Sequence, residues 1–121
     1  MTAGSYTAVI PAYSAAPYIA ETVSSILAQS VPPEWIIVVD DGSPDETSRV
    51  VAELKGPIVY VRQDNTGPGG ATTRGIAMVE TEYVATIDQD DLWLPDKTRL
   101  QLARLAADRE AAAVFGRVVE F

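Results

Sequence analysis

Acidic side chains follow two apolar segments of this 121-residue chain, and their types and spacing suit the binding of a hard cation. The two groups are Asp40-Asp41-Gly42-Ser43 and Asp88-Gln89-Asp90-Asp91. On an extended segment alternate side chains point the same way, so Asp88 and Asp90 can reach one ion. We expect both groups to converge on one crevice, where their five carboxylates would repel one another and bound Mg²⁺ or Mn²⁺ would relieve the repulsion. We therefore predict a divalent metal site that Asp88 and Asp90 can both reach.

Each acidic group also has a plainer interpretation. Acidic residues crowd into exposed turns, so Asp88 to Asp91 can be read as a solvated turn. The segment from Asp40 to Ser43 can be read as a turn that ends in a helix cap, with Asp41 free to accept hydrogen bonds.

A glycine-rich segment, Gly67 to Gly70, adds a candidate phosphate site. Backbone N–H groups of such loops can approach a phosphate closely. The segment lacks the spacing and the lysine of a P-loop, and no G-x-G-x-x-G follows the first apolar run. A flexible loop is the competing interpretation, and Arg74 is either a surface charge or a cation for a diphosphate.

Composition excludes several other kinds of chemistry. With 9 Lys and Arg against 17 Asp and Glu the net charge is −8, the wrong sign for binding nucleic acid. The chain has no cysteine and no histidine, which removes disulfides, zinc-thiolate sites, thiol catalysis and an imidazole base. It has no apolar stretch long enough to span a membrane and no signal-peptide pattern, so we expect a cytoplasmic location.

These side chains are positioned by a regular alternation of short apolar runs and helical patterns. Five runs predict strands: Thr7 to Ile10, Trp35 to Val39, Ile58 to Val61, Tyr83 to Ile87 and Ala113 to Val119. Helical spacing lies between them at Ile19, Val23, Ile26 and Leu27, at Val50, Val51 and Leu54, at Ile76 and Val79, and at Leu100, Leu102 and Leu105. This alternation predicts an α/β fold, a doubly wound and mainly parallel sheet with helices on both faces.

Two helix starts are predicted from capping signals. Ser43 and Glu46 have the spacing of a capping box with Pro44 in the first turn, and Pro95 with Asp96 opens the last helix. In such sheets ligands bind beyond the carboxyl ends of the strands. Four strand ends carry polar or glycine-rich segments: Pro11 to Ser14, Asp40 to Ser43, Gln63 to Gly70 and Asp88 to Asp91.

Several of these segments together resemble a known family. They are Val9-Ile10-Pro11-Ala12-Tyr13, Ile26-Leu27-Ala28-Gln29-Ser30, Val38 to Ser43 with Thr47, Asn65-Thr66-Gly67, and Asp88 to Asp91 with Trp93 and Pro95. In this order and spacing, from about Thr7 to Leu105, the chain resembles the nucleotide-sugar half of a family-2 glycosyltransferase of the GT-A (Rossmann-like) fold.

The resemblance implies inverting transfer of a sugar from a nucleoside diphosphate, of the UDP or dTDP type, to an acceptor hydroxyl, with a divalent metal. It implies that Pro11 and Tyr13 flank the base and that Asp41 bonds it. It also implies that Asp88 approaches the ribose and that Asp90 holds the metal. Further residues at the nucleotide-sugar site would be Ala12, Asp40, Gly67, Arg74 and Gln89.

Three features depart from the family pattern. Ser14 stands where the family usually has Asn, and Thr72 and Thr73 stand where it usually has Arg and Asn. The chain ends at Phe121, before the acceptor-binding elements and general base that such enzymes have. We therefore expect residues 1–121 to be a single nucleotide-sugar-binding domain, truncated at its acceptor-binding part. We expect it to transfer no sugar efficiently alone and to dimerise or aggregate through its C-terminal edge.

Two alternatives remain at this point. One is a non-catalytic nucleotide-sugar binding module. The other is a receiver-like Mg²⁺-binding signalling domain, which fits less well because its acid pair would follow the first strand, where Pro11 to Ser14 has no acid.

Overall fold

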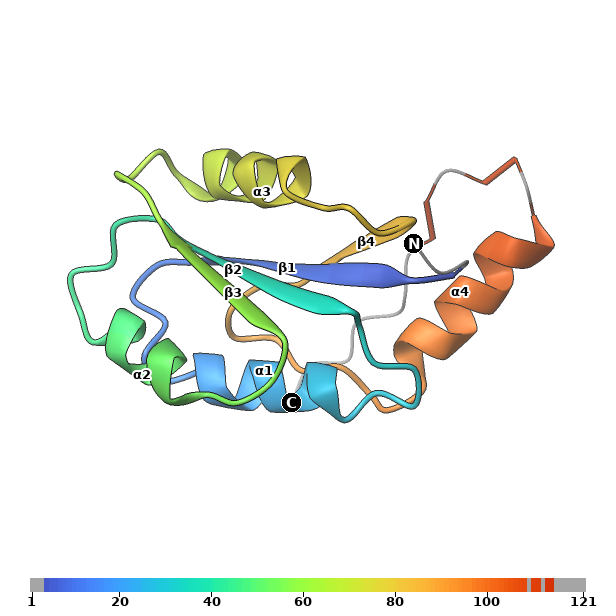
Figure 1. The fold of residues 1–121 in the computed structure, drawn as a ribbon, viewed down its shortest axis with the longest axis horizontal. Helices are drawn as coiled ribbons and strands as arrows, with labels where there is room; N and C mark the ends of the chain where they lie inside the picture. The colour runs from blue at the N-terminus through green and yellow to red at the C-terminus, as the bar shows by residue number, and fades with distance from the viewer. Residues whose placement is uncertain (1–3, 109, 112, 115–121) are drawn as a thin grey trace.

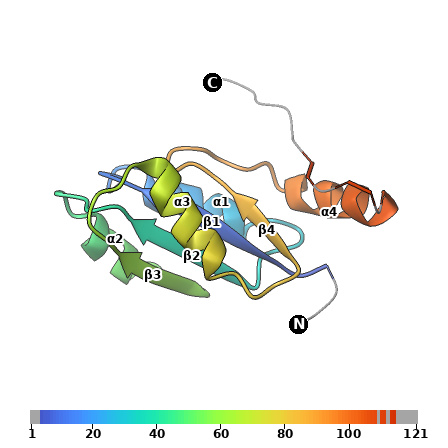
Figure 2. The same ribbon diagram turned by 90° about the horizontal axis from the view of Figure 1, so that it is seen from above.

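The computed structural model describes residues 4–108, 110–111 and 113–114. Its elements are β1 (Tyr6–Ala12), α1 (Ile19–Leu27), β2 (Trp35–Asp40), α2 (Thr47–Glu53), β3 (Ile58–Arg62), α3 (Pro68–Ala77), β4 (Tyr83–Thr86) and α4 (Lys97–Ala107). The strands form one sheet in the order β3-β2-β1-β4, and all neighbours are parallel. Helices α1 and α2 lie on one face and α3 on the other, which confirms the doubly wound α/β prediction (Figures 1 and 2).

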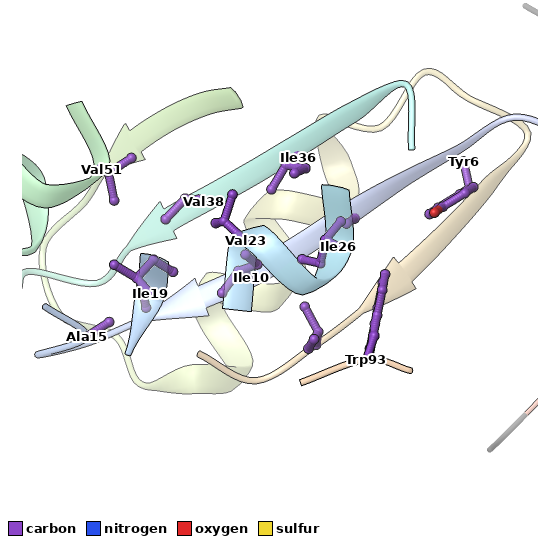
Figure 3. Packing of buried hydrophobic residues seen from close by; sticks show 13 residues of the cluster. Tyr6, Ile10, Ala15, Ile19, Val23, Ile26, Ile36, Val38, Val51 and Trp93 are labelled. Atoms are coloured by element: carbon purple, nitrogen blue, oxygen red, sulfur yellow. The ribbon is translucent and has the colours of Figure 1, made fainter. Parts of the chain in front are cut away.

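Both faces of the central strands are buried, as their continuous apolar runs predict. Val9 and Ile10 are neighbours on β1, so they point to opposite faces, and neither has exposed surface. Ile10 belongs to the larger core cluster, which packs against α1 and includes Ile26 and Trp93 (Figure 3). Val9 belongs to a smaller cluster that packs against Ala71 of α3. The sheet is therefore held firmly at its centre, where the candidate site begins.

The structure corrects one predicted helix start and confirms the other. Helix α2 begins at Thr47, not after Ser43, and Asp45 accepts the Thr47 N–H at 3.1 Å. The Ser43 hydroxyl instead accepts the N–H of Ser14 at 3.0 Å. Helix α4 does begin after Asp96, but that side chain caps no backbone N–H and accepts bonds from other side chains.

The predicted fifth strand is not seen in the part that the structure describes. Ala113 and Val114 belong to no strand, and residues 115–119 lie outside the described residues. Beside the edge of β4 lies a groove of about 460 Å³, between that strand and α4. Self-association through this side of the molecule stays a prediction. Among the helices of the described ranges, none combines the length and apolar character needed to cross a bilayer.

Gly75 lets α3 approach the sheet closely. A Cβ at this position would overlap Val9 Cγ1 and lie 3.2 Å from Val39 Cγ2, and both valines are stiff, β-branched side chains. Gly75→Ala is therefore expected to lower the free energy of unfolding by about 1–3 kcal/mol, measured by urea titration. Gly69 on the same helix has open space at that position, so Gly69→Ala is the control and should not destabilise the protein. Equal effects of the two substitutions would contradict this account of the packing.

Candidate functional site

The chain reverses its winding direction between β1 and β4, so the carboxyl ends of these strands mark the expected ligand crevice. The Gln89 side chain joins the two ends. Its Oε1 accepts the Tyr13 N–H at 2.6 Å, and its Nε2 donates to the Tyr13 carbonyl at 2.8 Å. Gln89 therefore uses both ends of its amide on the neighbouring backbone, while the Tyr13 ring beside it is 47% exposed.

Asp41 organises the loop between β3 and α3. Its Oδ1 accepts bonds from Gln63 Nε2 at 2.8 Å and from the Thr66 N–H at 2.9 Å, and its Oδ2 accepts the Gly67 N–H at 2.8 Å. These bonds, led by the one from Gln63, hold the pKa of Asp41 below its ordinary value. The Asp41 N–H donates to the carbonyl of buried Ala12, which ties this loop to β1.

Asp40 lies deeper than its neighbour. Its carboxylate has no exposed surface and accepts bonds from the Tyr60 hydroxyl, from Arg62 Nη1 at 3.2 Å and from the Ser43 N–H at 2.9 Å. Burial, followed by the bond to Asp40, raises the pKa of Tyr60. This carboxylate has no exposed surface for a ligand to contact in this structure, and its bonds hold the end of β2.

Asp88, Asp90 and Asp91 form a separate, exposed acidic group after β4. Partial burial and then the negative charges of Asp88 and Asp90 raise the pKa of Asp91. Within the described ranges, no three acidic residues are arranged to hold a metal by themselves, so the five carboxylates expected to converge do not form one metal cluster. Two exposed carboxylates still suit Mg²⁺, which is commonly held by one or two carboxylates together with substrate phosphates.

The remaining predicted residues lie around these loops. Pro11 is half-buried at the end of β1, and Gly67 precedes α3 with a φ of +89°, a conformation that favours glycine. Arg74 is exposed on α3, and its Nη1 lies 3.4 Å from Gln63 Oε1. Gln63 also bonds Asp41, so this long, weak bond puts Arg74 on the Asp41 side of the site.

Sequence reasoning gave no role to two sets of polar residues that shape the site. Gln63 bridges Asp41, Thr66 and Arg74. Its position directly after a strand was a signal that could have placed it at the site. Thr22 and Ser25 on α1, and Gln29 just after the end of that helix, bond to the segment that follows β4. Their spacing became informative only once that segment was known to pass beside α1.

Residues 7–121 match the family model described as Glycosyl transferase family 2. The succinoglycan biosynthesis protein ExoW of Rhizobium meliloti is 35% identical over 120 residues, which cover 91% of this chain and 38% of the relative. The chondroitin synthase of Escherichia coli is 33% identical over 109 residues, covering 88% of this chain and 16% of that protein.

The fold has solved counterparts. The structure of Staphylococcus aureus TarS 1–349 in complex with UDP-GlcNAc aligns with a TM-score of 0.80 and 26% identity, covering 97% of this chain and 37% of that chain. The present chain thus spans less than two fifths of the length of each of these proteins.

Proposed function

Because the chain belongs to Glycosyl transferase family 2, we propose that it forms the donor-binding part of an inverting glycosyltransferase. The enzyme would move a sugar from a nucleoside diphosphate to an acceptor hydroxyl. The observation that carries the proposal is the meeting of the Tyr13, Asp41 and Asp88 to Asp90 segments around the carboxyl ends of β1 and β4. The similarity to a protein solved with UDP-GlcNAc supports the same ligand class. No observation favours a non-catalytic binding module or a receiver domain.

We place the base of the nucleotide between β1 and Asp41. The exposed Tyr13 ring offers an apolar face, with Pro11 beside it. Asp41 Oδ2 accepts one bond, from Gly67, and so keeps acceptor capacity. Uracil and thymine carry a donor at N3 that suits this oxygen, whereas cytosine carries an acceptor there. A uridine or thymidine diphosphate is therefore the proposed ligand.

We place the ribose and diphosphate at the acidic group after β4. Asp88 would accept a bond from the ribose, and Asp90 would hold Mg²⁺ or Mn²⁺ on the diphosphate. Such a metal supplies positive charge beside the phosphate oxygens that become more negative as the sugar leaves. Asp90 would fix where that charge sits, and Gly67 and Arg74 would border the nucleotide on the Asp41 side.

Inversion also needs a base that takes the proton of the acceptor hydroxyl. We propose that this base lies beyond Phe121, since the relatives are much longer than this chain. A cytoplasmic location and a homodimer likewise stay predictions.

The test is calorimetry of the protein with UDP, dTDP and CDP, in Mn²⁺ and then in chelator. We expect UDP or dTDP to bind at least about tenfold more tightly in Mn²⁺ than in chelator. CDP is the matched control, because it keeps the diphosphate and lacks the N3–H, and it should bind more weakly than UDP. An affinity for UDP that does not change with chelator would remove the metal from the proposal, and equal affinity for CDP would remove the role of Asp41.

A further inference from the structure

Helix α1 and the turn that follows it carry polar side chains that bond the chain after β4. Thr22 and Ser25 are three residues apart, so they share one face of the helix, and Gln29 lies just beyond the helix end at Leu27. The segment that they meet runs from Gln89 to Thr98. Ser25 Oγ accepts the Trp93 N–H at 3.1 Å, and Gln29 Nε2 donates to the Leu94 carbonyl at 2.7 Å. Gln29 Oε1 accepts the Thr98 N–H at 3.0 Å, so α1 and the turn after it bond this segment along almost its whole length.

Thr22 makes the contact nearest to the acidic group. Its hydroxyl lies 2.7 Å from the Gln89 carbonyl oxygen and 2.9 Å from that of Asp91, and its side chain is fully buried. These two carbonyls belong to the residues on either side of Asp90. The Asp90 side chain itself is exposed, and the Asp91 N–H closes a turn onto the Asp88 carbonyl at 3.1 Å.

The same short loop is also held from its other side. The Gln89 side chain bonds both backbone groups of Tyr13, while the Gln89 carbonyl accepts the Thr22 hydroxyl. The backbone before Asp90 is therefore tied to β1 by a side chain and to α1 by its carbonyl. The backbone after Asp90 is tied to α1 by the second Thr22 contact. A loop held at these points directs an exposed carboxylate without a bond to that carboxylate.

We propose that Thr22 is a positioning residue for Asp90: its buried hydroxyl shares its one hydrogen between the two flanking carbonyls and so sets where the Asp90 carboxylate stands. The inference rests on the proposed function, in which Asp90 holds a divalent metal. Mg²⁺ and Mn²⁺ tolerate little displacement of their ligands, and residues that orient a ligand typically change metal affinity about 10- to 100-fold. Thr22 reaches Asp90 only through the backbone, so it is a positioning and not a catalytic residue.

The test compares Thr22→Val with Thr22→Ser in the intact protein. Valine keeps the shape of threonine and removes the hydroxyl, whereas serine keeps the hydroxyl. Thr7→Val is the matched control. Thr7 is also buried and bonds a neighbouring hydroxyl, that of Thr81 at 2.8 Å, but it lies near the start of β1, away from the carboxyl ends of the strands.

The first measurement needs no ligand. Amide hydrogen exchange at Asp91 reports the order of the loop, and Thr22→Val should speed it about tenfold relative to the wild type. Thr22→Ser and Thr7→Val should leave it close to the wild-type rate. Unchanged exchange in Thr22→Val would overturn the inference, whatever the nucleotide does.

The second measurement is the Mn²⁺ concentration that gives half-maximal tightening of UDP binding. Thr22→Val should raise it about 10- to 100-fold, with the affinity for UDP in chelator unchanged and with serine restoring the wild-type value. An equal loss of UDP affinity with and without Mn²⁺ would show a general structural role and overturn the inference. If the wild type itself showed no response to Mn²⁺, the proposed function would fail, and the exchange measurement would still decide whether Thr22 orders the loop.

Discussion

Replacing Asp90 with asparagine is expected to abolish the Mn²⁺-dependent tightening of UDP binding and to slow sugar transfer by the intact enzyme about 10³-fold. An amide has a similar shape but no charge, so it is a poor ligand for a hard cation. The rate loss follows because Asp90 would direct positive charge at the leaving diphosphate, where charge develops in the transition state. Removing one such preorganised contact commonly costs about 10²- to 10³-fold in rate.

The neighbouring acids provide the comparison. Asp88→Asn should weaken UDP binding to a smaller extent, because it removes a bond to the ribose rather than the principal metal ligand. Glu80→Gln changes the net charge by the same amount at an exposed residue after α3 and should change neither quantity. Isothermal calorimetry and initial transfer rates would measure these effects. A larger loss in Asp88→Asn than in Asp90→Asn would exchange the two assignments, and an unaffected Asp90→Asn enzyme would remove the metal role from this loop.

The elements of the sheet were predictable because their signals are local. Val9, Ile10 and the apolar run of β2 are buried on both faces, and an uninterrupted apolar run is typical of such strands. Asp41 and Asp90 both come after predicted strands. Because the carboxyl ends of parallel strands meet at one edge of the sheet, both residues could be predicted to lie at that edge. The identity of the ligand did not follow from these signals, and it depended on a resemblance across several segments.

What the sequence did not reveal was how each polar side chain is used. Ser43 and Glu46 have the spacing of a capping box, yet Ser43 Oγ bonds Ser14, which is 29 residues earlier in the chain. Asp40 and Asp41 look alike in the sequence, but Arg62 and Tyr60 approach only Asp40. Such choices depend on partners that tertiary packing brings close, and local propensity carries no information about them.

The second large effect is expected at Asp41. Asp41→Asn should disorder the loop between β3 and α3 and weaken UDP binding about 10- to 100-fold, since bonds to a charged acceptor are stronger than neutral ones. The groups facing this carboxylate are donors: Gln63 Nε2 and the Thr66 N–H at one oxygen, and the Gly67 N–H at the other. An asparagine keeps one acceptor oxygen and turns its NH₂ group towards one of these donors, whichever way the amide is flipped. Calorimetry with UDP measures the first effect, and amide exchange at Thr66 and Gly67 measures the second.

The pH dependence of stability shows whether the charge of Asp41 is the cause. The bonds from Gln63, Thr66 and Gly67 lower the pKa of Asp41 in the folded protein below its ordinary value of 3.8. As the pH falls below 3.8, the unfolded chain therefore binds a proton before the folded protein does, and the stability contributed by Asp41 is lost. The wild type should exceed Asp41→Asn in free energy of unfolding by a constant amount at higher pH, and this difference should shrink as the pH falls through the folded pKa.

The pKa values of Asp45 and Asp96 are also lowered, but both residues are present in the two proteins, so their contributions cancel in the difference. Urea unfolding followed by tryptophan fluorescence between about pH 7 and about pH 3 measures the difference, and a value that stays constant throughout would mean that the shape of the Asp41 side chain, and not its charge, holds the loop.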